Sequence, residues 1–387
     1  MRVIICTWAW RSHLTPLVQL GWSLRASGHE VVVASSAGLA SAISETGLTA
    51  VVVGEDVDLH AQAGKYFSWL VDQDGPVRWH DIRHWGAGNV ATYRVIAQRA
   101  VGPLLAFARR WQPDLIVFDP TTYAGPLVAA VLGIPAVRHI WGIDYTYRTR
   151  EFEPEALREL CAELGLDTVE TLGAATVDPC PASLQYDTGV RTLPIRFAPF
   201  NGPVAAADVG LPQPRRPRVC VLGSSAVEQL AGRAIPFVDQ VLSGLTGLGV
   251  ETLVLASATA APAFTEDGET VAFLGPTPLH LLLADCALVI HQGGGGALMT
   301  TLHYGLPQLL TPLFTDHVAN AEQLAAAGAC RWLFGGALEP DAVRKEVRQL
   351  LEDKEFRVRS ERLRDEMRAQ PPVAHVVDAL AELAGAR

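Results

Sequence analysis

Short apolar segments alternate with amphipathic ones through the first half of the chain. The apolar segments are rich in Val and Ile, as expected of buried strands, and they occupy residues 3–7, 30–34, 50–53, 115–118 and 136–139. The segments between them, such as 17–26 and 123–132, have a helical pattern. This alternation predicts a parallel sheet with helices on both faces.

A second alternation of the same kind begins at Arg218. Its apolar segments occupy residues 218–222, 252–255, 271–274, 287–290, 308–311 and 330–333. We therefore predict an α/β protein of two doubly wound, Rossmann-like domains that face each other across a cleft. The N-terminal domain is predicted over 1–203 and the C-terminal domain over 218–370. A linker joins them over 204–217, where Pro, Gly, Ala and Arg dominate the composition.

Two segments lie outside this alternation. An amphipathic helix is expected over 371–387, after a Pro-Pro start signal, and we expect it to pack back on the N-terminal domain. Residues 55–95 carry many aromatic side chains and few helix signals. Such an insertion is more often substrate-facing than a packed connector, so we predict that it contacts a substrate.

Composition narrows the class of protein. Of 387 residues, 49% are hydrophobic and 19% charged, which fits parallel strands buried between helices. The formal net charge of −10 argues against nucleic acid or an anionic membrane as a partner. No apolar run approaches the roughly 18 residues of a membrane span, and the N-terminus lacks the parts of a signal peptide, so we expect a cytoplasmic protein. The six cysteines have no metal-ligand or redox spacing and are expected in the core.

The most informative stretch is an apolar segment that leads into a histidine and four glycines. Residues 288–297 have the sequence Leu-Val-Ile-His-Gln-Gly-Gly-Gly-Gly-Ala, and the alanine can open a helix. Glycines let backbone N–H groups approach an anion closely, and a helix N-terminus carries partial positive charge, so this turn is predicted to bind phosphate. The predicted ligands are His291, Gly293, Gly295, Gly296 and Ala297.

Two polar residues, Asp316 and His317, follow one βα unit later. The helix after the glycine turn is expected to stop at Gly305-Leu-Pro307, and the next apolar segment leads to this pair. Neighbouring parallel strands end at one edge of a sheet, so phosphate donors and hydroxyl acceptors should share that edge. A nucleotide-sugar diphosphate needs that combination. A dinucleotide fingerprint would instead require G-x-G-x-x-G and an acidic residue about 20 positions later.

His13 is the candidate base of the first domain. It follows the first predicted strand, in a loop before a helix whose start is signalled by Thr15 and Pro16. Asp119 ends another predicted strand at the same edge, where it could hold the second ring nitrogen and stabilise an imidazolium. The competing interpretations are a histidine bonded within its own loop and a helix N-cap aspartate before Pro120.

Other candidates have equally strong competing interpretations. Ser224 and Ser225 end the first strand of the second domain and could donate to phosphate oxygens, but helix capping is at least as common. Thr277 and Pro278 precede a short helix and could pair with a nucleotide base through exposed backbone, but a plain turn also explains them. His291 could donate an N–H to the diphosphate or be a buried strand-end histidine.

Together, these motifs resemble the antibiotic-pathway glycosyltransferases of actinomycetes. The likeness extends through nearly the whole chain and is carried by residues 12–16, 111–115, 141–142, 200–203, 289–296 and 305–308. It implies the GT-B fold and an inverting, metal-independent transfer of a deoxysugar from a nucleotide diphosphate, expected to be TDP, to a polyketide or macrolide aglycone. Desosamine-type transferases look closest, and some of those need a haem-protein-like activator.

The resemblance also implies roles for single residues. In that family the histidine matching His13 acts as base, the residue matching Asp119 is its acidic partner, and the residue matching Asp316 holds sugar hydroxyls. We expect His317 to tune the choice of sugar. The residues expected to bind the acceptor are Trp8, Trp10, Phe67, Trp69, Trp79 and Trp141.

Two residues depart from the family pattern. Gln292 stands where a second histidine is usual, and Ala297 where Thr or Ser is usual. The missing hydroxyl removes one phosphate hydrogen bond, worth about 1–3 kcal/mol, while the backbone donors remain. We therefore expect retuned donor binding with activity retained.

Two other functions remain open at this point. A nucleotide-sugar 2-epimerase of the same two-domain shape would consume no acceptor. A catalytically silent partner subunit would bind donor and assist another transferase, and the presence of both His13 and Asp119 argues against it. We expect a monomer or a homodimer.

Overall fold

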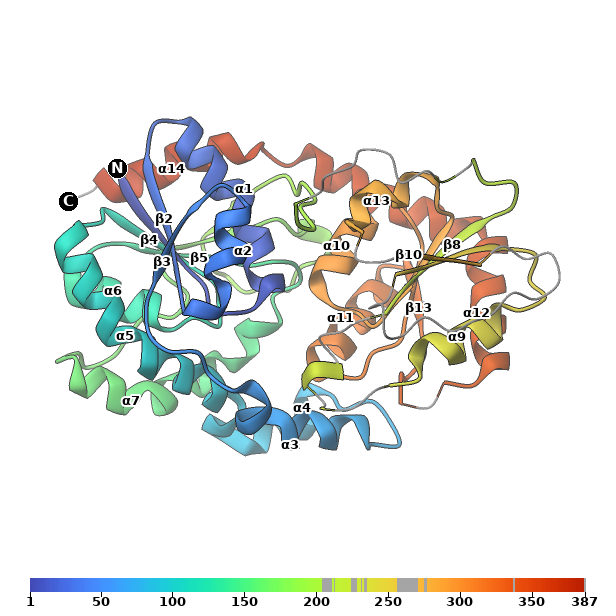
Figure 1. The fold of residues 1–387 in the computed structure, drawn as a ribbon, viewed down its shortest axis with the longest axis horizontal. Helices are drawn as coiled ribbons and strands as arrows, with labels where there is room; N and C mark the ends of the chain where they lie inside the picture. Colours follow the sequence, from blue (N-terminus) through green and yellow to red (C-terminus); the bar gives the residue numbers. More distant parts are fainter. Residues whose placement is uncertain are drawn as a thin grey trace. The chain divides into compact units, whose positions relative to one another are not determined.

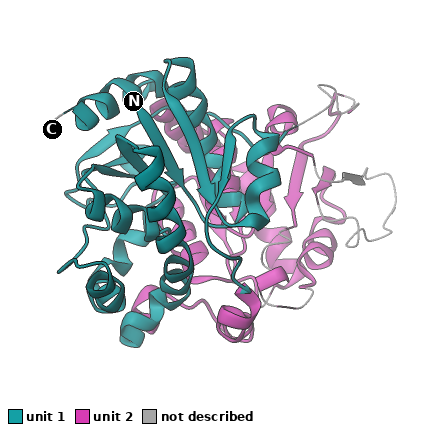
Figure 2. Cartoon of the chain, turned by 60° about the vertical axis from the view of Figure 1, so that its left-hand side comes forward, with its two compact units in different colours: residues 1–58, 83–203, 369–387 teal, residues 59–82, 204–368 magenta. Residues whose placement is uncertain are grey.

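The computed structural model describes residues 1–203, 211, 213–223, 228–230, 232, 235–255, 271–274, 277–336 and 338–385. The chain forms two compact units (Figure 2). Unit 1 contains residues 1–58, 83–203 and 369–387, and unit 2 contains residues 59–82 and 204–368. Within the described ranges, no helix is both long and apolar enough to cross a membrane.

Unit 1 is built on a parallel seven-stranded sheet with the strand order β3-β2-β1-β4-β5-β6-β7. Its strands are β1 (Arg2–Cys6), β2 (Glu30–Ser35), β3 (Thr49–Val52), β4 (Leu115–Phe118), β5 (Ala136–His139), β6 (Ala175–Asp178) and β7 (Thr192–Pro194). The order reverses between β1 and β4. In sheets of this kind, ligands bind outside the carboxyl ends of the strands at that reversal.

Helices cover both faces of this sheet (Figure 1). Val3 and Ile5 of β1 pack on the side of α1 (Arg11–Ala26), α2 (Ala40–Glu45) and α14 (Val373–Gly385). Ile4 and Cys6 pack on the side of α5 (Ala91–Trp111), α6 (Ala124–Leu132) and α7 (Glu153–Glu163). Successive side chains of a strand point to opposite faces, and both faces are covered, which explains why residues 3–6 of β1 are all apolar.

Unit 2 repeats this design with a parallel six-stranded sheet of order β10-β9-β8-β11-β12-β13. Its strands are β8 (Arg218–Leu222), β9 (Glu251–Leu255), β10 (Val271–Leu274), β11 (Leu288–His291), β12 (Gln308–Leu310) and β13 (Cys330–Trp332). The order reverses between β8 and β11. The longer helices of residues 235–369 are α9 (Phe237–Leu245), α10 (Gly295–His303), α11 (Thr315–Ala326), α12 (Pro340–Glu352) and α13 (Lys354–Ala369).

Residues 59–82 fold as part of unit 2, although the sequence analysis assigned them to the N-terminal domain. They form α3 (Leu59–Val71) and α4 (Trp79–Ile82). Leu70 and Val77 pack with Leu313 and Phe314 in one buried cluster. The apolar residues of the segment therefore complete a core that lies far away in the sequence, and its many polar and aromatic residues hide the helical pattern.

The last two strands of the unit 1 sheet, β6 and the edge strand β7, also lack a clear sequence signal. In β6, Thr176 and Asp178 alternate with apolar residues, and β7 has only three residues and ends at Pro194. A proline removes a backbone donor and is tolerated at a sheet edge. The predicted linker over 204–217 lies largely outside the described residues, since 204–210 and 212 are not among them.

We expect Leu380→Ala to lower the free energy of unfolding by about 2–4 kcal/mol, because it leaves a cavity where a fully buried leucine of α14 joins the core of unit 1. Glu382→Ala, on the exposed face of the same helix, should change it by less than about 0.5 kcal/mol. Urea titration followed by tryptophan fluorescence measures both. Equal unfolding midpoints for the two variants would contradict a structural role for α14.

Candidate active site

His13 and Asp119 meet at the carboxyl edge of the unit 1 sheet. β1 and β4 pair with Cys6 opposite Phe118, and the N–H of Asp119 donates to the Cys6 carbonyl at 3.0 Å. The Nδ1 atom of His13, in the first turn of α1, lies 2.8 Å from Oδ2 of Asp119. The Asp119 side chain is only 1% exposed and that of His13 is 14% exposed, so the contact is shielded from water.

The other oxygen of Asp119 is held by its neighbours in sequence. Oδ1 accepts the Thr121 N–H at 2.9 Å, the Thr121 hydroxyl at 2.5 Å and the Thr122 hydroxyl at 3.3 Å. These bonds orient the carboxylate so that Oδ2 faces His13. A carboxylate oxygen can only accept, so Nδ1 carries the proton of its contact with Oδ2, and Trp8 Nε1, 3.2 Å from Nδ1, gives its own proton to the closer Thr121 hydroxyl. The lone pair of His13 then lies on Nε2, which has no hydrogen-bond partner among the described residues. That nitrogen can accept a proton.

Aromatic rings surround His13. The Trp141 ring centroid lies 4.3 Å from that of His13, and the Trp8 centroid lies 4.9 Å from it in an edge-on arrangement. Trp8 stacks on Trp10 at 5.4 Å, and its Nε1 donates to the Thr121 hydroxyl at 2.9 Å. The three tryptophans that sequence analysis assigned to the acceptor from this unit therefore gather around the candidate base.

The glycine turn of unit 2 leaves an uncapped helix N-terminus. Gly293 has φ +97°, and a Cβ there would lie 3.2 Å from the Cβ of His317, so a side chain does not fit. The N-cap of α10 is Gly294, and no side chain caps the helix. The first N–H groups of a helix have no intrahelical acceptor, so they can bind an anion. A Cβ at Gly296 would meet nothing within 4 Å, so this part of the turn is open.

His291 does not donate to a ligand in this arrangement, which corrects its assignment as a direct diphosphate ligand. Its Nε2 lies 2.7 Å from Oε1 of Gln308, and its Nδ1 accepts the Gly293 N–H at 3.0 Å. Both ring nitrogens thus have protein partners, and burial lowers the pKa of His291 to about 4. His291 is a neutral side chain that shapes the turn.

The glycine turn and the start of α11 lie close together, as expected of segments that follow two neighbouring parallel strands. Nδ2 of Asn320 donates to the Gly293 carbonyl at 2.9 Å. Asp316, in the first turn of α11, has a side chain that is 49% exposed. In the described part of the chain, three buried polar atoms at this turn lack partners: Oε1 of Gln292, Nδ1 of His317 and Oδ1 of Asn320. Buried polar atoms normally have partners, so the site suits a polar ligand.

Phe67, Trp69 and Trp79 lie in unit 2 and are not part of the aromatic group around His13. The Phe67 ring packs on Phe314 at 4.7 Å, Trp79 packs against the same core, and Trp69 stacks on Tyr66 at 6.2 Å. This packing accounts for the apolar character of the three side chains without an acceptor.

The remaining candidates are placed as follows. Thr277 and Pro278 precede a short helix that is tied to the end of α10 by the Tyr304 hydroxyl, which donates to the His280 carbonyl at 2.6 Å. The Ala297 side chain packs on the core around Cys220 and Leu253, so its contribution to a ligand is its backbone N–H. Ser224 and Ser225 lie outside the described residues.

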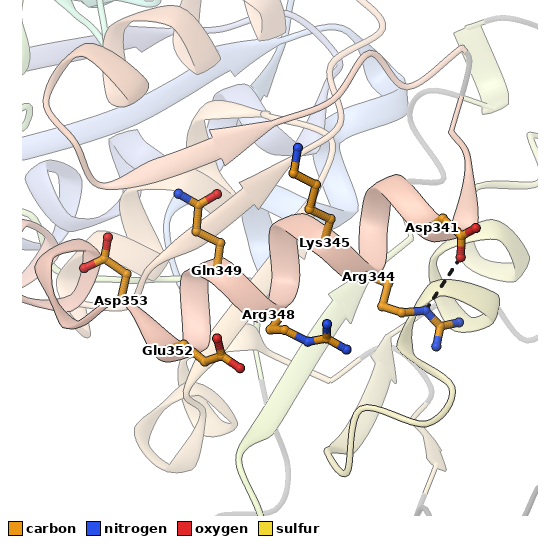
Figure 3. A pocket seen from close by; sticks show the side chains of 7 residues that line it. All are labelled: Asp341, Arg344, Lys345, Arg348, Gln349, Glu352 and Asp353. Atoms are coloured by element: carbon orange, nitrogen blue, oxygen red, sulfur yellow. Dashed lines mark ion pairs between the residues drawn. The ribbon is translucent and has the colours of Figure 1, made fainter.

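A shallow depression along α12 contains neither a His–Asp pair nor an uncapped glycine turn like those described above (Figure 3). Its side chains come from one helix and the residue after it, and they point in different directions. They are Asp341, Arg344, Lys345, Arg348, Gln349, Glu352 and Asp353. Among the residues that the structure describes, no three His, Cys, Asp or Glu side chains are grouped to hold a metal ion.

Three residues of these sites were not among those predicted from the sequence. Thr121 fixes Asp119 and Trp8, Gln308 fixes His291, and Asn320 ties α11 to the turn. Thr121 had a signal in its position two residues after Asp119, where a hydroxyl often bonds a carboxylate. Gln308 lies in one of the segments that carry the family resemblance, but a whole helix separates it from the turn and nothing local indicates its contact with His291. Asn320 carries no local signal.

The fold and these two sites define a glycosyltransferase of the GT-B class. The solved structure of glycosyltransferase VinC in complex with dTDP superposes with a TM-score of 0.85 at 30% identity, and the match covers all of both chains. Spinosyn rhamnosyltransferase SpnG complexed with thymidine diphosphate matches 98% of this chain and all of that one, with a TM-score of 0.82 at 27% identity.

The chain belongs to the EryCIII-like family. Residues 22–224 match the model described as erythromycin biosynthesis protein CIII-like, N-terminal domain, and residues 239–383 match the corresponding C-terminal domain. The chain is 32% identical over its whole length to 3-alpha-mycarosylerythronolide B desosaminyl transferase of Saccharopolyspora erythraea, of which it covers 99%. It is 33% identical over 99% of its length to 10-deoxymethynolide desosaminyltransferase of Streptomyces venezuelae, of which it covers 97%.

The buried neutral state of His291 predicts a pH dependence of stability. The unfolded histidine takes up a proton near pH 6.5, whereas the folded one does so only near pH 4. Between these values the unfolded state binds more protons, so the free energy of unfolding falls as pH falls, by at most about 1.4 kcal/mol per pH unit.

Between pH 6.5 and 4.5, the free energy of unfolding of the His291→Gln variant should fall less steeply with falling pH than that of the wild type, because the variant lacks the contribution of His291. Urea titrations at several pH values measure this slope. Burial also lowers the pKa of His139 to about 4, and burial raises that of Asp178 to about 7. Both groups are present in the two proteins, so their contributions cancel in the comparison. Equal slopes for wild type and variant would contradict a neutral buried His291.

Proposed function

We propose that this glycosyltransferase transfers a sugar from a TDP-sugar to a polyketide-type aglycone, with inversion at the anomeric carbon. The 2.8 Å contact between His13 and Asp119 carries the proposal, because it supplies a base with one free nitrogen. TDP is supported by the solved relatives that hold it. The aglycone is supported by the relatives named for 3-alpha-mycarosylerythronolide B and 10-deoxymethynolide.

The reaction is a single displacement. The acceptor hydroxyl gives its proton to Nε2 of His13, and its oxygen forms the new bond to the anomeric carbon. The bond from that carbon to the diphosphate oxygen breaks, and TDP leaves with the electron pair. The imidazolium that forms is stabilised by the buried carboxylate of Asp119.

The donor half of the reaction is assigned to unit 2. The N–H groups of Gly295, Gly296 and Ala297 bind the diphosphate, and their fixed dipoles stabilise the negative charge of the leaving group. The proposal assigns this role to backbone donors rather than to a metal. Asp316 accepts hydrogen bonds from sugar hydroxyls, and His317 beside it tunes the choice of sugar.

The acceptor half is assigned to unit 1. Trp8, Trp10 and Trp141 form an apolar surface around His13 that suits a largely hydrocarbon aglycone. Phe67, Trp69 and Trp79 are left out, because they pack on unit 2. Thr277 and Pro278 are retained as contacts to the nucleotide base, and Ser224 and Ser225 as phosphate donors. A haem-protein-like activator is retained on the likeness to desosaminyl transferases.

Transfer has more support than the alternatives considered from sequence. The relatives named above are transferases, and nothing in the comparisons supports a 2-epimerase. A silent partner subunit would not need a shielded His–Asp pair with one ring nitrogen free to act as base.

Removal of the base tests the mechanism. His13→Ala should lower kcat for an alcohol acceptor by about 10²- to 10⁴-fold with little change in the Kd of TDP. His80→Ala, which removes an exposed histidine of α4, is the matched control. Turnover is measured as TDP release with a macrolactone alcohol that the wild type accepts. Near-normal turnover of the His13 variant would remove this residue from the mechanism.

Obstruction of the open turn tests the donor site. Gly296→Val should raise the Kd of TDP at least about tenfold in calorimetry, because a branched side chain occupies the space that the diphosphate needs. Gly102→Val is the matched control, since Gly102 is an exposed helical glycine of α5 with open space around it. Unchanged TDP affinity in the Gly296 variant would place the diphosphate elsewhere.

A further inference from the structure

The segment 59–82 contacts the part of unit 2 that carries Asp316. The hydroxyl oxygens of Tyr66, in α3, and Thr315, the first residue of α11, lie 3.2 Å apart. The neighbouring Phe67 ring packs on Phe314 at 4.7 Å. Phe314 and Thr315 directly precede Asp316, so α3 touches the two residues that lead into the proposed sugar-binding residue.

The same segment holds α11 at a second place. Nε of Arg78 lies 2.5 Å from Oε1 of Glu322, which follows Asp316 by about 1.7 helical turns. Beneath both contacts, Leu70 and Val77 are buried against Leu313. The helix is therefore fixed along its length by residues from the N-terminal half of the sequence.

The first turn of α11 depends on this contact because it lacks a conventional cap. Its N-cap is Phe314, which offers no side-chain acceptor to the free N–H groups of the helix. Thr315 is 3% exposed, and Tyr66 is partly buried beside it. Desolvation raises the pKa of Tyr66 to about 12, so its phenol keeps its proton at physiological pH and the hydroxyl contact does not change with pH there.

We propose that Tyr66 is a positioning residue for the donor sugar. Through Thr315 it fixes the first turn of α11, and so it determines where Asp316 and His317 present their side chains to the sugar. This inference rests on the proposed role of Asp316 in sugar binding. It gives residues 59–82 a role on the donor side of the reaction, in place of the acceptor contact expected from sequence.

The test compares intact donor with nucleotide alone, using TDP-glucose and TDP in calorimetry. Tyr66→Phe keeps the ring and removes only the hydroxyl. It should raise the Kd of TDP-glucose about five- to tenfold and leave the Kd of TDP within twofold. Thr315→Val should have the same effect, and the double variant should add nothing, because both changes remove one contact.

Tyr147→Phe is the matched control, since this tyrosine donates its hydroxyl to the Thr188 carbonyl within unit 1. It should change neither Kd. An unchanged Kd for TDP-glucose in Tyr66→Phe would overturn the inference. So would an equal loss for TDP and TDP-glucose, because that result indicates a general disturbance of unit 2.

Asp316→Ala separates this inference from the function on which it rests. Loss of TDP-glucose affinity in Asp316→Ala, with none in Tyr66→Phe, would refute only the role of Tyr66. Unchanged affinity of Asp316→Ala for both ligands would refute the sugar-binding role of Asp316 and, with it, the positioning role of Tyr66. Selective loss in both variants is the expected result.

Discussion

The hydrogen bond from the Asp119 N–H to the Cys6 carbonyl fixes the position of the candidate catalytic residues of unit 1. It extends the pairing of β1 and β4 one residue beyond Phe118, at the point where the strand order reverses. The chain leaves these strands toward helices on opposite faces of the sheet, so a space for ligands forms outside the strand ends. His13, the threonines that hold Asp119 and the three tryptophans all depend on this geometry.

Unit 2 has the same strand reversal but uses it for different chemistry. Unit 1 places the ionisable side chains of His13 and Asp119 there, and the proposed mechanism uses them to move a proton. Unit 2 places uncapped backbone N–H groups there, and these are proposed to bind and release the diphosphate. This difference explains the neutral state of His291. In the proposed arrangement the end of α10 meets the charge of the diphosphate, while His291 holds the Gly293 N–H and the Gln308 side chain.

Candidate site residues could be placed from sequence where it was enough to know that parallel strands end at the same edge of a sheet. The strands that lead to His13, Asp119 and the glycine turn are apolar over most of their length, and the carboxyl ends of strands in one parallel sheet must share an edge. Sequence reasoning failed where a partner came from a distant element. The ring nitrogens of His291 are occupied by Gln308 and a turn N–H, which no local pattern reveals. Residues 59–82 pack on a core completed more than 200 residues later, so their apolar positions were taken for a substrate surface.

Because of this packing, residues 59–82 belong to unit 2, the half of the enzyme that is proposed to bind the donor. The chain passes from unit 1 to unit 2 and back within its first 83 residues, well before the linker that the sequence predicts over 204–217. An exchange of residues 218–370 between relatives would therefore move Phe314 and Thr315 without the Phe67 and Tyr66 that contact them. Residues in contact contribute non-additively to stability and binding, so the new α11 would meet a surface selected for another sequence. The half of the enzyme that is proposed to bind the donor is therefore one packed body made from two separate stretches of sequence. An exchange that preserves its geometry has to include residues 59–82.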